Sequence, residues 1–156
     1  MELSCLMDKV KNAVCALVNE YCTNDPFEIC ASAGIHVFFS DLPDVTEGVY
    51  YRIKGHKIIL INERLNRREA RIVAAHELGH AVLHPKSNYV FMTASTLLLP
   101  QRLEREAELF CCELLLYGFE TEICPQSDIT ARQIACIKGV PENMAELWLS
   151  ARGFMA

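Results

Sequence analysis

One stretch of the chain, residues 66–85, constrains the fold more than any other. A capping box that begins at Asn66 starts a helix, and Pro85 ends it. Three small apolar residues lead straight into His76, which predicts a buried helix that carries His76 and His80 inward. Two unpaired histidines would be costly in a protein interior. We therefore expect this helix at the centre of the fold and its two imidazoles in a specific site.

The motif His76-Glu77-Leu78-Gly79-His80 indicates the chemistry of that site. Histidines four residues apart leave the same face of a helix, so both rings can bind one zinc ion. Glu77 then lies beside the metal, where its carboxylate can take a proton from a bound water molecule. The other interpretation is a solvated helix face that carries two histidines by chance, which fits poorly with the apolar run before the motif. The motif therefore predicts a catalytic zinc centre with Glu77 as general base.

A catalytic zinc site needs a third protein ligand, and a later helix offers three glutamates. Glu104 lies closest to the centre of the apolar stripe of that helix, about 60° away. Glu108 follows one turn later on the same side, where it can accept a hydrogen bond from a ligating imidazole. Glu106 points to the opposite flank, where we expect solvent. Helical geometry therefore favours Glu104 as the third ligand and leaves Glu106 as its rival.

His84 extends the same row of histidines, but it adjoins the helix-ending Pro85. His76 and His84 are two turns apart, about 12 Å along the helix axis, so three ligands in one row would strain the site. We expect His84 to cap the helix or to support the ligands.

The remaining pattern predicts an α+β fold, with helices on one side of a small, mainly antiparallel sheet. Apolar spacing and cap residues predict helices at 3–21, 26–33, 66–84, 100–117 and, as two short helices, within a C-terminal helical segment at about 127–152. Residues that suit a pleated, half-buried surface predict strands at 35–39, 48–53 and 57–61, with a turn at 54–56. Residues 86–99 suit a loop with one edge strand.

Length and charge narrow the class of protein. A chain of 156 residues suits one domain, which we expect to span residues 1–156. The net charge of −5 argues against a nucleic-acid surface, because phosphate binding needs a concentration of Lys and Arg. No apolar run is long enough to span a bilayer, and the acidic N-terminus lacks the basic region of a signal peptide. We expect a cytoplasmic protein that contacts neither membrane nor nucleic acid directly.

The eight cysteines lie at positions 5, 15, 22, 30, 111, 112, 124 and 136. They include no Cys-x-x-Cys pair, and most stand where a small apolar residue belongs. We interpret them as reduced, structural residues and not as disulfides or metal ligands.

Taken in order, several segments of the chain resemble the ImmA/IrrE family of metallo-endopeptidases. These segments are Asp25-Pro26-Phe27-Glu28-Ile29, Gly34-Ile35, Gly48 with Tyr50, Ile61-Asn62, His76-Glu77-Leu78-Gly79-His80 with Leu83-His84, and Glu104-x-Glu106-Ala107-x-x-Phe110 with Leu114-Leu115. Many peptidases share the zinc motif alone, whereas the ordered set is much more specific. The family's usual Phe-Ala and Leu-Leu-Met-Pro become Phe110-Cys111 and Leu114-Leu115-Leu116-Tyr117 here.

The resemblance implies a zincin-like single domain and a zinc-dependent endopeptidase, a hydrolase of bacterial or phage mobile elements. Its zinc ligands would be His76, His80 and Glu104, and its base Glu77; the family pattern also contains Glu106. Members of the family look like enzymes that cleave a helix-turn-helix repressor, often encoded beside them, so such a repressor is the expected partner. Hydrolysis also needs a donor that stabilises the oxyanion. Candidates for that donor are Tyr50, Tyr51, His36, His56 and Tyr117.

Three other classes fit parts of the sequence. Residues 134–148 resemble part of a helix-turn-helix, but the would-be recognition helix carries Glu142 and Glu146 and no Arg that reads bases. A zinc-binding regulatory or partner-binding protein without hydrolytic activity would not need Glu77. A zinc hydrolase with a substrate other than protein stays open. Cleavage of a co-encoded repressor, abolished by Glu77→Gln, separates the peptidase from all three.

Overall fold

The computed structural model describes residues 2–85, 101–122 and 128–153, and the structural statements below refer to them. In chain order the elements are α1 (Glu2–Tyr21), α2 (Pro26–Ser32), β1 (Ile35–Ser40), β2 (Gly48–Ile53), β3 (His56–Asn62), α3 (Arg67–Leu83), α5 (Gln101–Leu115), α6 (Phe119–Glu122), α7 (Ala131–Lys138) and α8 (Glu142–Ser150). The α+β class is confirmed. The edge strand expected within 86–99 lies outside the described residues. Within the described ranges, no helix has the length and apolar character needed to cross a membrane.

The sheet is mixed, with the strand order β1-β3-β2. β2 and β3 form an antiparallel hairpin, and its turn holds Lys54 and Gly55 at positive φ, as a tight hairpin turn requires. β3 also pairs with β1 in parallel, with Ile35 opposite Lys57. The pairing is therefore not mainly antiparallel as expected. β1 and β2 run in opposite directions, and β3 lies between them, parallel to one and antiparallel to the other.

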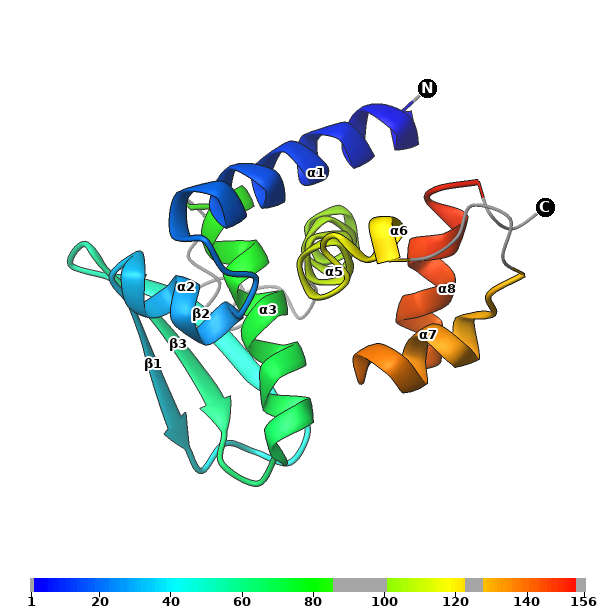
Figure 1. Ribbon diagram of the computed structural model, residues 1–156. Coiled ribbons are helices and arrows are strands. Elements are labelled where there is room, and N and C mark those ends of the chain that lie inside the picture. Colours follow the sequence, from blue (N-terminus) through cyan, green and yellow to red (C-terminus); the bar gives the residue numbers. More distant parts are fainter. Residues whose placement is uncertain (1, 86–100, 123–127, 154–156) are drawn as a thin grey trace.

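Helices cover the sheet in successive layers. α2 packs on β1, α3 packs on β2 and β3, α5 packs on α3, and α8 follows beyond α5 (Figure 1). The start of β2 lies very near α3, because a Cβ atom on Gly48 would be 2.3 Å from Cγ1 of Val73. Only glycine allows this approach, which brings the edge of the sheet to the face of α3.

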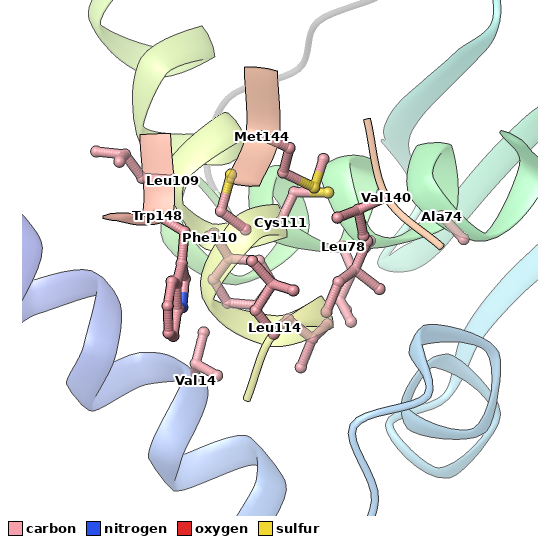
Figure 2. Packing of buried hydrophobic residues seen from close by; sticks show 14 of the residues in the cluster. Val14, Ala74, Leu78, Leu109, Phe110, Cys111, Leu114, Val140, Met144 and Trp148 are labelled. Carbon is pink, nitrogen blue, oxygen red and sulfur yellow. The ribbon is translucent and has the colours of Figure 1, made fainter. Parts of the chain in front are cut away.

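α5 is the central helix of the molecule, since α1, α3 and α8 all pack against it. Figure 2 shows the buried side chains that meet there, among them Val14 from α1, Leu78 from α3, Phe110 and Leu114 from α5, and Trp148 from α8. Every residue from Leu109 to Leu115 is buried. The apolar stripe seen in the sequence is therefore only part of the buried surface of this helix.

The predicted capping signals form as expected. The Asn66 side chain accepts hydrogen bonds from the backbone N–H groups of Arg68 and Glu69, and the Glu69 carboxylate accepts one from the Asn66 backbone. The Asp25 side chain caps α2 by accepting hydrogen bonds from the backbone N–H groups of Phe27 and Glu28. His84 is the C-cap residue of α3, which was one of its two predicted roles. These local hydrogen bonds set where α3 begins and ends.

The C-terminal helices α7 and α8 are fixed to the start of α3. Gly139, at a φ of 69°, ends α7, and the Arg68 side chain donates hydrogen bonds to the carbonyls of Gly139 and Ala135 at 2.5 and 3.3 Å. The buried residues of α8 are Met144, Ala145, Trp148 and Leu149. Its apolar face thus lies in the core, which supports packing over the DNA-binding interpretation.

The described cysteines are all free thiols. Cys30, Cys111 and Cys112 are buried, and burial raises the pKa of Cys30 and Cys111 to about 12. The remaining described cysteines, 5, 15, 22 and 136, are exposed. The prediction that the cysteines stand in small apolar positions therefore holds for only three of the described cysteines, the buried ones.

Candidate metal centre

Three predicted ligand residues come together between α3 and α5. The Nε2 atoms of His76 and His80 lie 3.1 Å apart on one face of α3. Glu104, in the first turn of α5, brings one carboxylate oxygen to 3.3 Å from Nε2 of His76 and the other to 3.2 Å from Nε2 of His80. Among the described residues, this is the one group of His, Cys, Asp or Glu donors near enough to share an ion. We call these three residues the donor set.

The chemistry and spacing of the donor set fit a zinc ion. Zinc binds imidazole nitrogen and carboxylate oxygen at about 2.0–2.2 Å, and tetrahedral bonds of that length separate neighbouring ligand atoms by about 3.3–3.6 Å. The separations in the donor set are 3.1, 3.2 and 3.3 Å. Three protein ligands also leave one tetrahedral position for water or substrate, as catalytic sites require.

The donor set depends on close packing of α3 against α5 at Gly79. A Cβ atom on Gly79 would lie 3.0 Å from Cδ1 of Phe110 and 3.2 Å from both Cα and the carbonyl oxygen of Ala107. Both neighbours belong to α5, and the Ala107 atoms are backbone atoms that cannot rotate away. The missing side chain of Gly79 therefore lets α5 lie near enough for Glu104 to reach the two imidazoles.

Glu77 lies beside the donor set without belonging to it. The residue is 8% exposed, and its carboxylate accepts a hydrogen bond from the backbone of Tyr50 in β2. Burial raises the pKa of Glu77, whereas His76, His80 and the Tyr50 hydrogen bond oppose that rise. A carboxylate with a raised pKa, held by a strand next to the donor set, has the properties of a general base.

The charges of the donor set compensate one another. Burial lowers the pKa of His76, but its hydrogen bond with Glu104 and the nearby carboxylates raise it above its ordinary value. The hydrogen bonds from the two imidazoles hold the pKa of Glu104 well below its usual range. Glu104 is therefore ionised at neutral pH and can serve as an anionic ligand.

Glu106, the rival ligand, lies on another side of α5. Its carboxylate is 1% exposed and pairs with Lys9 of α1 at 2.7 Å and with Arg102 at 3.0 Å. The expectation of solvent on this flank is wrong, because α1 packs against it. Burial alone would raise the pKa of Glu106, but the hydrogen bonds from Lys9 and Arg102 hold it below its ordinary value.

His84 lies beside Glu106 and is not a member of the donor set. Its Nε2 atom lies 3.7 Å from a carboxylate oxygen of Glu106, and its ring centre lies 5.9 Å from that of His80. Burial lowers the pKa of His84, so the ring is neutral at neutral pH. We call Lys9, His84, Arg102 and Glu106 the Glu106 cluster.

A cleft of about 660 Å³ opens beside the donor set. Its lining comes from the loop before β2, from α3, from α5 and from the start of α8: Asp44, Val45, Thr46, Glu47, Gly48, Ile72, Val73, His76, Glu77, Glu104, Glu108, Cys111, Pro141, Asn143 and Met144. The wall contributed by Pro141, Asn143 and Met144 was not predicted. No local pattern in the sequence signals it, because it depends on how α8 packs against α5.

Glu108 occupies a different place from the one expected. The residue is exposed in the cleft, and among the described residues no hydrogen bond joins it to His76. Its charge nevertheless raises the pKa of His76. Glu108 therefore influences the donor set through charge and presents its carboxylate to the cleft.

None of the five predicted oxyanion donors is among the described residues that line the cleft. Tyr51, His36 and His56 lie on the sheet face turned away from α3, because Tyr50 and Gly48 occupy the other face. The Tyr117 hydroxyl lies 3.9 Å from Sγ of Cys15 on α1. The described lining of the cleft therefore supports none of the five as the oxyanion donor.

The chain is similar in sequence to known proteins over most of its length. Residues 30–148 match the peptidase M78 family, described as the IrrE N-terminal-like domain. The chain is 38% identical over 138 residues to "Uncharacterized immunity region protein 2" of Bacillus phage phi105, which covers 88% of this chain and 87% of that protein. It is 30% identical over 146 residues to "Metallopeptidase ImmA" of Bacillus subtilis (strain 168), covering 92% of this chain and 86% of that protein. The chain therefore belongs to the ImmA/IrrE family.

Proposed function

We propose that this chain is a zinc-dependent endopeptidase that hydrolyses a peptide bond in a protein partner. The observation that carries the proposal is the donor set, two imidazoles and a carboxylate whose ligand atoms lie within 4.8 Å of one another. His76, His80 and Glu104 would hold the zinc ion. When bound, zinc supplies a Lewis acid that activates water and polarises the scissile carbonyl group.

Glu77 performs the proton transfers in the proposed reaction. Its carboxylate accepts a proton from the attacking water as the new carbon–oxygen bond forms, and it delivers that proton to the amide nitrogen as the carbon–nitrogen bond breaks. One water molecule is consumed, and the products are a carboxylic acid and an amine, which ionise to a carboxylate and an ammonium group. The hydrogen bond from the Tyr50 backbone holds Glu77 in place for both transfers.

The proposed peptidase domain comprises residues 1–156. α1 supplies Lys9 to the Glu106 cluster, and α8 supplies Met144 and its neighbours to the cleft. The helical segment at about 127–152 is thus part of the peptidase and not a separate module.

The proposed substrate is a helix-turn-helix repressor. The phage relative is named for an immunity region, and the Bacillus subtilis relative is named a metallopeptidase, which together support proteolysis in the control of immunity. Such repressors act on DNA inside the cell, so we propose a cytoplasmic location. The chain itself would contact the repressor and not the DNA.

Incubation of the zinc-loaded protein with the repressor encoded beside it tests the proposal. We expect a defined cleavage product, and we expect Glu77→Gln to keep zinc while the rate falls by about 10²–10⁴-fold. Glu146→Gln, which changes an exposed carboxylate of α8 outside the cleft, is the matched control and should cleave normally. A stable complex with an intact repressor would instead indicate a zinc-binding regulatory protein without hydrolytic activity.

A further inference from the structure

The cleft beside the donor set is amphipathic. Apart from Glu77, its buried lining residues are apolar and come from three helices: Val73 of α3, Cys111 of α5 and Met144 of α8. Its exposed lining residues include the carboxylates of Asp44, Glu47 and Glu108. No Lys or Arg is present among the described residues that line it. The cleft therefore combines an apolar floor with an acidic rim.

Cys111 belongs to the floor and not to the chemistry of the site. Its Sγ atom donates a hydrogen bond to the Ile72 carbonyl at 3.5 Å, and burial keeps it a neutral thiol. Its side chain and that of Met144 come from α5 and α8 respectively (Figure 2). The two sulfur-containing side chains therefore offer a polarisable apolar surface for an aliphatic chain.

Of the rim carboxylates, Glu108 is the one best placed to meet a substrate. Asp44 already pairs with Arg64, and Glu47 lies on the loop before β2. Glu108 has no ion pair among the described residues. It lies on α5 one turn beyond Glu104 and one turn before Cys111, between the donor set and the apolar floor.

We propose that the cleft receives a Lys or Arg side chain adjacent to the scissile bond, and that Glu108 recognises its charge. Lys and Arg carry a long aliphatic stem and a cationic head, which match the floor and the rim. An acidic side chain would meet carboxylates of the same charge. A purely apolar side chain would desolvate Glu108 without a partner for its charge. The inference rests on the proposed peptidase function and adds a substrate class, polypeptides with a basic residue at the cleavage site.

A peptide library prepared from a bacterial proteome tests this preference. After incubation with the zinc-loaded wild type, mass spectrometry should find Lys or Arg enriched within about two residues of the cleaved bonds. Glu108→Lys should lose that enrichment, and Glu108→Asp should keep it. Glu146→Lys makes the same charge change on an exposed residue outside the cleft and should behave as the wild type. For one cleaved peptide, replacing the basic residue by Gln should lower kcat/KM about tenfold in the wild type and little in Glu108→Lys.

The zinc content of Glu108→Lys and Glu108→Asp separates substrate recognition from support of the metal. Loss of the preference for Lys or Arg in Glu108→Lys at saturating zinc supports recognition, even where the changed charge weakens zinc binding. If zinc affinity falls in proportion to activity while the preference for Lys or Arg persists, Glu108 supports the ligands and the inference is overturned. Cleavage by the wild type without a basic preference overturns it as well.

A binding measurement keeps this inference distinguishable from the peptidase proposal. The zinc-loaded Glu77→Gln variant is titrated with two fluorescent peptides of Ala and Gly that carry either Arg or Glu at the centre. Tighter binding of the Arg peptide, lost on adding Glu108→Lys, supports the cleft assignment even if no peptide is ever cleaved; in that case the peptidase proposal alone fails. Equal binding of the two peptides overturns the assignment.

Discussion

Two carboxylates on α5, separated by one residue, have opposite surroundings. The Glu104 side chain is 41% exposed and lies against two imidazole nitrogens. The Glu106 side chain is 1% exposed and lies against Lys9 and Arg102. An open carboxylate beside two imidazole nitrogens can take up a cation from solution, whereas an enclosed carboxylate already has cations supplied by the chain. The direction of a side chain around a helix, and not its neighbours in sequence, thus decides whether the carboxylate serves binding or stability.

The comparison predicts that replacing Glu104 and replacing Glu106 have different effects. Loss of Glu104 should weaken metal binding and leave the fold intact. Loss of Glu106 should weaken the fold and leave metal binding intact. Each variant below is therefore measured both for zinc affinity and for the free energy of unfolding of the metal-free protein.

The largest effect should come from Glu104→Ala. Zinc sites distribute about 10–16 kcal/mol over their ligands, so losing one ligand should weaken zinc binding at least about a hundredfold. The free energy of unfolding should change by less than about 1 kcal/mol, because Glu104 is partly exposed and lies outside the apolar core. Competition with a chelator measures the affinity. Unchanged affinity here, with a large loss in Glu106→Ala, would reverse the two assignments.

The next effect should be the loss of stability in Glu106→Gln. A buried hydrogen bond to a charged group contributes about 1.5–3 kcal/mol, so we expect the free energy of unfolding to fall by about 2 kcal/mol. Zinc affinity should stay within about threefold of wild type, because the close polar partners of Glu106 are Lys9, Arg102 and His84 and not the donor set. Denaturant titration checks the first expectation, with the exposed Glu146→Gln as control. A stable Glu106→Gln protein would mean that Lys9 and Arg102 contribute nothing to the fold.

The same residue predicts a dependence of stability on pH. The pKa of Glu106 is lowered in the folded protein, so the folded state binds fewer protons than the unfolded chain. Its stabilisation is complete above the unfolded value, about 4.3, and is lost as pH falls through the lower folded pKa. The stability difference between wild type and Glu106→Gln should therefore be largest near pH ~6 and shrink towards pH ~3. A difference that stays constant over this range would exclude the charge of Glu106 as its cause.

The smallest effect should come from Gly79→Ala, which should lower both the stability of the fold and the affinity for zinc. The new methyl group meets Ala107 backbone atoms, so α5 has to move by a few tenths of an ångström. An overpacking cost of about 1–3 kcal/mol, offset in part by the helix propensity of Ala, should leave a net loss of about 1 kcal/mol. Zinc affinity should fall about tenfold as Glu104 moves away from the imidazoles. Wild-type affinity in this variant would show that the spacing of the two helices does not control the donor set.

Features encoded by neighbouring residues were predictable from the sequence. The capping box at Asn66, the turn at Gly55 and the shared face of His76 and His80 each depend on residues a few positions apart. The approach of Glu104 to the histidines was predictable too, because an apolar stripe orients that helix towards the core. The resemblance to the ImmA/IrrE family is confirmed by the family match over residues 30–148.

Features that depend on distant parts of the chain were not predictable in this way. Glu106 is buried because of Lys9, which lies 97 residues away, and the apolar stripe alone placed it in solvent. The parallel pairing of β1 with β3 depends on where the β2–β3 hairpin lies relative to β1. The α8 wall of the cleft likewise depends on tertiary packing.

The position of α1 has a consequence for where the boundary of the packed core is drawn. The family model matches residues 30–148, which begin after α1 has ended. Yet α1 provides Lys9 to Glu106, and its buried Met7, Val10 and Val14 belong to the core that surrounds α5. A chain cut back to residues 30–148 would keep the donor set but leave Glu106 without its nearest cation and the flank of α5 open to water. The stretch that the family model matches is therefore shorter than the part of the chain that packs around α5.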